Sequence, residues 1–234
     1  MRDDYLGTNA NVKGVSMSSG LILYSYFRSS ASHRVRIALN LKHLKFEYRA
    51  VHLVKNGGEQ YSDEYKRLNP QSQVPCLIHN NQPISQSMAI IDYLDQLAPE
   101  PRLLPSIAYD RALTIQICEI VNSGIQPLQN TAVLNELEKN YGLKAEQKTK
   151  WIQHWIARGL GSLEEILKKS SGDYCLGDQV TAADCFLIPQ LFSARRFSLD
   201  LTPYPTILRI EEHTKSLDAF QLAEPSRQPD FQAQ

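Results

Sequence analysis

The sequence predicts two domains of different class: an α/β domain at residues 20–101, followed by an all-helical domain at residues 106–230. Three observations support this division. Strand-like and helix-like segments alternate in the first part, strand patterns are missing from the second, and a proline-rich stretch at 99–105 separates them. Residues 1–19 are mostly polar and lack the apolar stretch of a secretory signal, so we predict a disordered extension there.

The first domain begins with a strand, a helix and a second strand. Leu21–Tyr24 is a short apolar run of strand-forming residues, and apolar residues then recur at helical spacing up to about Lys42. Residues 46–51 alternate between apolar and polar, as in a half-buried strand. A strand, a helix and a strand in close succession form a βαβ unit, which predicts that the two strands pair in parallel.

A short helix, a hairpin and a longer helix complete this domain. Residues 63–68 form the short helix, and Asn80-Asn81 then lies between two apolar runs. Because asparagine tolerates positive φ, this pattern predicts a hairpin. Ser87 is the predicted N-cap of an amphipathic helix that extends to Leu97. The order β-α-β-α-β-β-α is typical of a thioredoxin-like domain.

The second domain is predicted to contain helices only. The helical period indicates helices at 109–121, 133–139 and 147–169. The run Thr181-Ala182-Ala183-Asp184 has the form of a capping box before an apolar segment, and Pro205 opens a further helix. The last ten residues show no such pattern, and we predict that they are loosely held.

The charge balance and the cysteines narrow the class of protein. Basic and acidic residues are equal in number, 25 of each, which gives no argument for binding nucleic acid or a membrane surface. No apolar run approaches the roughly 18 residues of a membrane span. The 4 cysteines form no CxxC pair, and no histidine lies at metal-ligand spacing from them. This predicts buried thiols in a reducing compartment, no metal site and a cytoplasmic location.

A serine-rich turn between the first strand and its helix is the first candidate for chemistry. Ser29, Ser30, Ser32 and Arg34 lie where backbone N–H groups and the positive end of the helix converge, which suits an anion. A hydroxyl there can donate a hydrogen bond to a thiolate and so lower the pKa of the thiol. The alternative is that Ser29 and Ser32 only cap the helix.

Two further features fall at the same end of the predicted domain. In a thioredoxin-like domain, a cis proline at Val74-Pro75 leaves the preceding backbone groups free to pair with a peptide, although an ordinary trans proline is equally compatible. Gln86-Ser87 opens a helix whose N–H groups and hydroxyl can hold a carboxylate, or Ser87 can cap the helix without a ligand. Together with the serine turn, these features suit a small peptide with carboxylates and a thiol.

Several runs of residues resemble the zeta class of glutathione transferases. The longest extends from Tyr24 to Leu39 and contains Ser29-Ser30-Ala31-Ser32-His33-Arg34-Val35-Arg36. The shorter runs are Asn69-Pro70 with Gln73-Val74-Pro75, Gln86 to Ile90, Ile125 to Asn130, Tyr174 to Asp178, and Asp200 to Pro205. The resemblance covers about residues 21–230 and implies the glutathione transferase fold, a thioredoxin-like domain followed by a helical domain.

The resemblance also implies a glutathione site and a substrate site. Ser29 would stabilise the glutathione thiolate, with Ser30 and Ser32 in support. Arg196 would bind a substrate carboxylate, and Arg28 is a second candidate for that role. The other residues implied for glutathione are Arg34, Gln60, Val74, Pro75, Gln86, Ser87, Gln126, Asn130, Thr131 and Ala132.

The activity implied by the resemblance is glutathione-dependent cis–trans isomerisation of maleylacetoacetate to fumarylacetoacetate, in tyrosine and phenylalanine breakdown. Maleylpyruvate isomerisation and dehalogenation of small α-halo acids use the same residues and stay open, as does a non-catalytic binding module of the same fold. A homodimer is implied by the fold. One position departs from the family, because Ala31 stands where the family usually has cysteine. Since glutathione brings its own thiol, we expect altered kinetics and a retained function.

Overall fold

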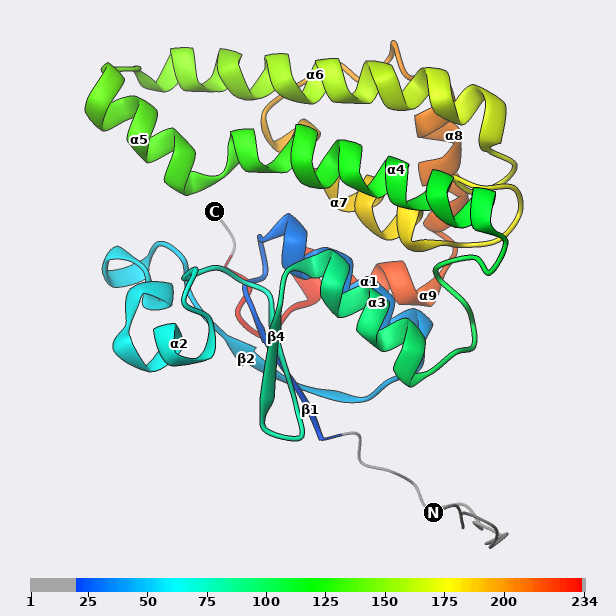
Figure 1. The fold of residues 1–234 in the computed structure, drawn as a ribbon. Helices are drawn as coiled ribbons and strands as arrows, with labels where there is room; N and C mark the ends of the chain where they lie inside the picture. Colours follow the sequence, from blue (N-terminus) through cyan, green and yellow to red (C-terminus); the bar gives the residue numbers. More distant parts are fainter. Residues whose placement is uncertain (1–19, 233–234) are drawn as a thin grey trace, which may run out of the picture.

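The computed structural model describes residues 20–232, so the extension predicted at 1–19 lies outside the described residues. A four-stranded sheet forms the lower part of the molecule in Figure 1, and long helices form the upper part. The α/β domain and the helical domain therefore follow one another along the chain, as the sequence predicts.

The sheet has the strand order β2-β1-β3-β4. β1 (Leu21–Ser25) pairs with β2 (Phe46–Ala50) in parallel, which confirms the prediction from the βαβ unit. β3 (Cys76–His79) and β4 (Gln82–Ser85) form the predicted hairpin, and β3 pairs antiparallel with β1. Asn80 and Asn81 have φ of 51° and 62°, so both turn residues occupy the left-handed region that asparagine tolerates.

Three α-helices belong to this domain: α1 (Ser30–Leu41), α2 (Asp63–Leu68) and α3 (Ser87–Leu97). In Figure 1, α1 and α3 lie between the sheet and the helical domain. Helix α1 contacts α3, α7 and α9, which leaves it covered on most sides. These contacts explain why residues 32–39 of α1 are all buried, the polar residues included.

The helical domain is built from α4 (Ala108–Gly124), α5 (Thr131–Tyr141), α6 (Ala145–Ser170), α7 (Ala182–Arg196), α8 (Pro205–Thr214) and α9 (Asp218–Ala223). Thr181 and Asp184 form the predicted capping box at the start of α7. One apolar core runs through both domains, from β1 through α1 and α3 to α4, α6 and α7. None of the helices in the described residues is long and apolar enough to span a membrane.

Two predictions about local structure were wrong. The N-cap of α3 is Gln86, and Ser87 is the first residue of the helix, where its hydroxyl caps no backbone group. The C-terminal segment is also better held than its pattern suggested. Residues 225–227 form a 3-10 helix, and Asp230 accepts hydrogen bonds from the α/β domain. These contacts are with residues far away in the sequence, so no local sequence pattern predicts them.

Candidate active site

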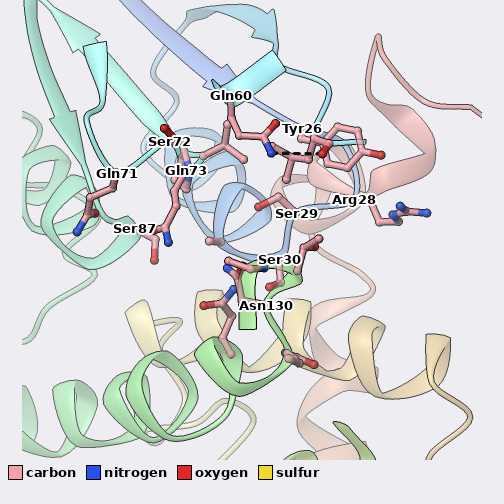
Figure 2. A pocket seen from close by; sticks show the side chains of 18 of the residues that line it. Tyr26, Arg28, Ser29, Ser30, Gln60, Gln71, Ser72, Gln73, Ser87 and Asn130 are labelled. Atoms are coloured by element: carbon pink, nitrogen blue, oxygen red, sulfur yellow. Dashed lines mark hydrogen bonds between the residues drawn. The ribbon is translucent and has the colours of Figure 1, made fainter. Parts of the chain in front are cut away.

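A polar cavity of about 200 Å³ opens between the two domains. The α/β domain contributes the β1–α1 turn, the segment before β3 and the start of α3, and the helical domain contributes residues near the junction of α4 and α5 and the end of α7. Figure 2 shows labelled side chains of both domains, Ser29, Ser30 and Asn130 among them, around one space. Every residue predicted for the site lines this cavity except Ser32 and Arg34.

Ser29 lines the cavity on the side of the α/β domain, and it combines the two roles that the sequence left as alternatives. It is the N-cap of α1, and its Oγ accepts a hydrogen bond from the Ser32 N–H at 3.2 Å. Accepting uses a lone pair and leaves the hydroxyl hydrogen free. Ser29 can therefore cap the helix and at the same time donate a hydrogen bond into the cavity.

Ser32 and Arg34 lie behind the residues of the α/β domain that line the cavity, and neither lines it directly. Both are buried, and the Ser32 Oγ has no hydrogen-bond partner in the described structure. Arg34 donates from Nη1 to Ser87 Oγ at 3.1 Å and to Asn122 Oδ1 at 2.8 Å. Its guanidinium also lies 4.2 Å from the centre of the Phe186 ring. Arg34 thus reaches the cavity only through its neighbours.

Arg34 carries a buried positive charge that is influenced by the charge of Glu119 but has no carboxylate in direct contact among the described residues. Among the described residues it forms no ion pair, and its Nε and Nη2 have no hydrogen-bond partner. Burial lowers its pKa to about 10, so it stays charged at neutral pH. A buried cation is costly unless an anion compensates it. The Ser87 hydroxyl is polarised by Arg34 and is free to donate a hydrogen bond. A ligand carboxylate bound to this hydroxyl would compensate the charge of Arg34.

The rest of this wall offers backbone and amide groups. The Val74–Pro75 peptide bond is cis, one of the two possibilities that the sequence left open. Gln86 has a φ of 72°, an unusual value for a residue other than glycine, and donates from Nε2 to Gln71 Oε1 at 2.5 Å. Gln60 is buried; its Nε2 donates to Leu53 O at 3.3 Å, while its Oε1 has no partner in the described part of the chain.

The helical domain closes the cavity from the other side. Asn130 is the N-cap of α5, and its Oδ1 accepts from the Ala132 N–H at 3.0 Å. Gln126, Thr131 and Ala132 line the same wall, as predicted. Sequence reasoning missed several lining residues, which are Tyr26, Asn69, Gln71, Ser72, Gln73, Asn122, Gln129 and Ser193. Tyr26 and Gln73 fall within runs that resemble the family, but Asn122 and Ser193 lie inside helices and only the tertiary structure places them here.

Two arginines stand at one end of the cavity. Arg28 follows the β1 strand and its guanidinium lies 5.9 Å from the centre of the Tyr26 ring, and Arg196 is at the end of α7. Partial desolvation, and then the nearby charge of Arg28, lower the pKa of Arg196. Neither arginine forms an ion pair within residues 20–232. Two neighbouring like charges without an ion-pair partner among the described residues are suited to an anionic ligand.

Comparison with known proteins identifies the family. A model described as "Glutathione S-transferase, N-terminal domain" matches residues 19–96, and its C-terminal counterpart matches residues 146–213. A probable maleylacetoacetate isomerase 2 of Drosophila melanogaster is 46% identical over 225 residues, 96% of each chain. The chain belongs to the glutathione S-transferase family. Its sequence signature places it in the zeta class, and the rat maleylacetoacetate isomerase is also 46% identical, over 91% of this glutathione transferase and 96% of the rat protein.

Solved structures agree with this assignment. The holo structure of a bacterial maleylpyruvate isomerase, described as a zeta-class glutathione transferase, has a TM-score of 0.87 and 43% identity, and covers 90% of this chain and 100% of its own. A maleylacetoacetate isomerase from Anaeromyxobacter dehalogenans with glutathione bound in its active site has a TM-score of 0.80 and 45% identity, covering 90% and 97%.

The residues present here fit glutathione on their own chemistry. The tripeptide has a thiol, two carboxylates and backbone amides. The cavity of this glutathione transferase offers a free hydroxyl hydrogen at Ser29, a buried acceptor without a partner at Gln60, and a polarised hydroxyl at Ser87 in front of the unpaired charge of Arg34. The thiol, one carboxylate and one amide N–H of the ligand therefore each have a complementary group on the protein.

Proposed function

We propose that this chain is a glutathione-dependent isomerase that converts maleylacetoacetate to fumarylacetoacetate. One observation carries the proposal: a hydroxyl turn suited to a thiolate and two unpaired arginines suited to a dianionic substrate line one cavity. The 46% identity to maleylacetoacetate isomerases over most of the chain supports the choice of substrate.

In this proposal the α/β domain holds glutathione. Ser29 donates to the sulfur, and Ser30 and the backbone at Val74 lie beside it. Gln60 binds the glycine end, while Gln86 and Ser87 bind the γ-glutamyl end with Arg34 behind them. Gln126, Asn130, Thr131 and Ala132 close the site from the helical domain. Ser32 acts only through the turn, because its side chain does not reach the cavity.

Glutathione, when bound, supplies a thiolate whose reversible addition to the substrate's cis double bond permits rotation. The protein supplies the electrostatics. A hydrogen bond from Ser29 favours the charged form of the thiol. Arg28 and Arg196 orient the carboxylate of the substrate and stabilise negative charge that develops on its carbonyl oxygens. The cavity holds both reactants together, which removes much of the entropic barrier.

Ala31 lines the cavity next to these groups, at the position where the family usually has cysteine. None of the steps assigned above needs a protein thiol, so the reaction is expected to proceed without it. The 4 cysteines of the chain are all buried elsewhere.

The decisive experiment is conversion of maleylacetoacetate, followed by absorbance with and without glutathione. Strict dependence on glutathione at a useful rate supports the proposal. If glutathione binds but nothing is converted, the reaction is wrong while the site stands. If the chain is not retained on a glutathione resin either, a non-catalytic module of the same fold is the better description.

Maleylpyruvate isomerisation is the second candidate. Two solved neighbours are maleylpyruvate isomerases, at 43% and 39% identity. The chemistry is the same and the substrates differ in size, so turnover of both substrates and of a small α-halo acid, measured side by side, ranks the three activities.

We also propose a homodimer in the cytoplasm. The dimer rests on the family, whose members pair through the α/β domain of one subunit and the helical domain of the other. The location rests on the 4 free, buried cysteines, which suit a reducing compartment. Sedimentation equilibrium at the mass of one chain would contradict the dimer.

A further inference from the structure

The turn that carries Ser29 is held from behind by the C-terminal segment. Ser29 N donates to Tyr26 O at 3.0 Å and closes the turn. The Phe27 N–H inside the turn donates to Asp230 Oδ2 at 3.0 Å, across 203 residues of sequence. The other oxygen of Asp230 accepts from the Tyr48 hydroxyl on β2 at 2.6 Å. One carboxylate therefore links the turn to the sheet.

Arg36 binds the carbonyl groups of the same turn. It is 1% exposed, and it donates to Phe27 O at 3.1 Å, to Tyr26 O at 3.4 Å and to Ser25 Oγ at 3.2 Å. Its Nε donates to Ala223 O at the end of α9 at 3.0 Å. Burial lowers the pKa of Arg36 to about 10, while Tyr48 and Asp230 raise it. The turn is thus fixed through an N–H group and through carbonyl groups, in both cases by residues tied to the chain after residue 222.

The segment that carries Asp230 is itself anchored. Gln228 Nε2 donates to Leu222 O at 2.9 Å and to Glu224 O at 2.8 Å, which fastens the segment to α9. The Phe231 ring packs edge-on against Phe27, with ring centres 5.6 Å apart. Asp230 is therefore a fixed acceptor, held in place because Gln228 and Phe231 on either side of it are anchored to α9 and to Phe27.

We propose that Asp230 is a positioning residue for the proposed reaction, one that holds the Tyr26–Ser29 turn so that the Ser29 hydroxyl meets the glutathione sulfur. The inference rests on the proposed function, since Ser29 matters only if glutathione binds there. Asp230 does not line the cavity, so it acts through the backbone of Phe27. Hydrogen bonds to a thiolate depend strongly on geometry, and small displacements of a catalytic group cost large factors in rate.

The direction in which the pKa of the bound thiol changes in Asp230→Ala distinguishes a positioning role of Asp230 from an effect of its charge. Removing a nearby negative charge favours a thiolate and lowers the pKa of the bound thiol. Releasing the turn weakens the hydrogen bond from Ser29 and raises it. For Asp230→Ala we expect the pKa of bound glutathione, read from the ultraviolet absorbance of the thiolate, to rise by about one unit. We expect kcat to fall about tenfold, with a smaller change in the dissociation constant of glutathione.

Two further variants grade the effect. Asp230→Asn keeps an oxygen for the Phe27 N–H and loses the charge, so it should restore most of the wild-type thiol pKa. Tyr48→Phe keeps the carboxylate and loses one of its two bonds, so it should shift the thiol pKa less than Asp230→Ala and in the same direction. It also serves if Asp230→Ala does not fold.

Asp200→Ala is the matched control. Asp200 likewise accepts one backbone N–H and one hydroxyl, both from Thr202 at 2.9 Å, on an exposed loop away from the cavity. It should leave the thiol pKa unchanged. An unchanged or lowered thiol pKa in Asp230→Ala, or in Tyr48→Phe if the first is unfolded, overturns the positioning role. A wild-type chain that forms no thiolate band overturns the proposed function and this inference with it.

Discussion

The two ends of the cavity present positive charge in opposite ways. At the Ser29–Ser87 end, the cation is Arg34, which is buried and acts through the Ser87 hydroxyl at 3.1 Å. At the other end, Arg28 and Arg196 line the cavity directly. A charge behind a hydroxyl gives a fixed, directional hydrogen bond, whereas an open guanidinium adapts to different carboxylates. The first arrangement suits a constant cofactor and the second a variable substrate.

Ser29→Ala tests the first end and has the largest expected effect. Losing the donor to the thiolate should lower kcat roughly 100-fold and change the affinity for glutathione much less. Steady-state kinetics with both reactants varied measures this. Ser62→Ala is the control, because Ser62 Oγ also caps a helix by accepting from an N–H at 3.2 Å. Ser62 does not line the cavity and has no role in the proposed reaction. Unchanged turnover in Ser29→Ala would move the role to Ser30.

Ser87→Ala should weaken glutathione binding by roughly tenfold or more, because a charge-assisted hydrogen bond is lost and Arg34 loses a partner. Calorimetric titration with glutathione measures the dissociation constant. The turnover at saturating glutathione should stay close to that of the wild type. A dissociation constant equal to that of the wild type would remove Ser87 from the site.

Arg196→Ala breaks the second end. We expect the KM for maleylacetoacetate to rise about tenfold, as a carboxylate loses one exposed partner, while glutathione binding is retained. Arg195→Ala is the matched control, since the neighbouring arginine pairs with Glu211 and points elsewhere. An equal loss in both variants would show a general effect on the end of α7. An effect confined to Arg28→Ala would assign the carboxylate to Arg28.

Ala31→Cys has the smallest expected effect. It introduces the cysteine that the family usually has, beside a site whose assigned steps use only the thiol of glutathione. We expect kcat to change by less than about threefold, since no hydrogen bond or charge in the assigned steps is altered. Measured turnover that rises tenfold or more would show that this cysteine contributes to the reaction.

Sequence reasoning succeeds for the features that depend on residues close together in the chain. The α/β unit, the parallel first pair, the Asn80-Asn81 turn and the capping box at Thr181 depend on near neighbours, and the structure has them all. The structure also places most of the predicted site residues around one cavity. The error at Ser87 is one of register: Ile90 N–H donates to Gln86 O, so Gln86 is the N-cap, and the Ser87 hydroxyl accepts from Arg34 of another helix.

By itself, the sequence determined the order of elements, the two domains and the chemical types that line the cavity, because periodicity, turns and caps act over a few residues. Only the tertiary structure decided that Ser32 and Arg34 lie behind the wall, that Asn122 and Ser193 belong to it, and that Asp230 returns to hold the turn. The reason is physical: burial and long-range hydrogen bonds depend on which surfaces pack together, and a carboxylate 203 residues from its partner leaves no mark on the local pattern.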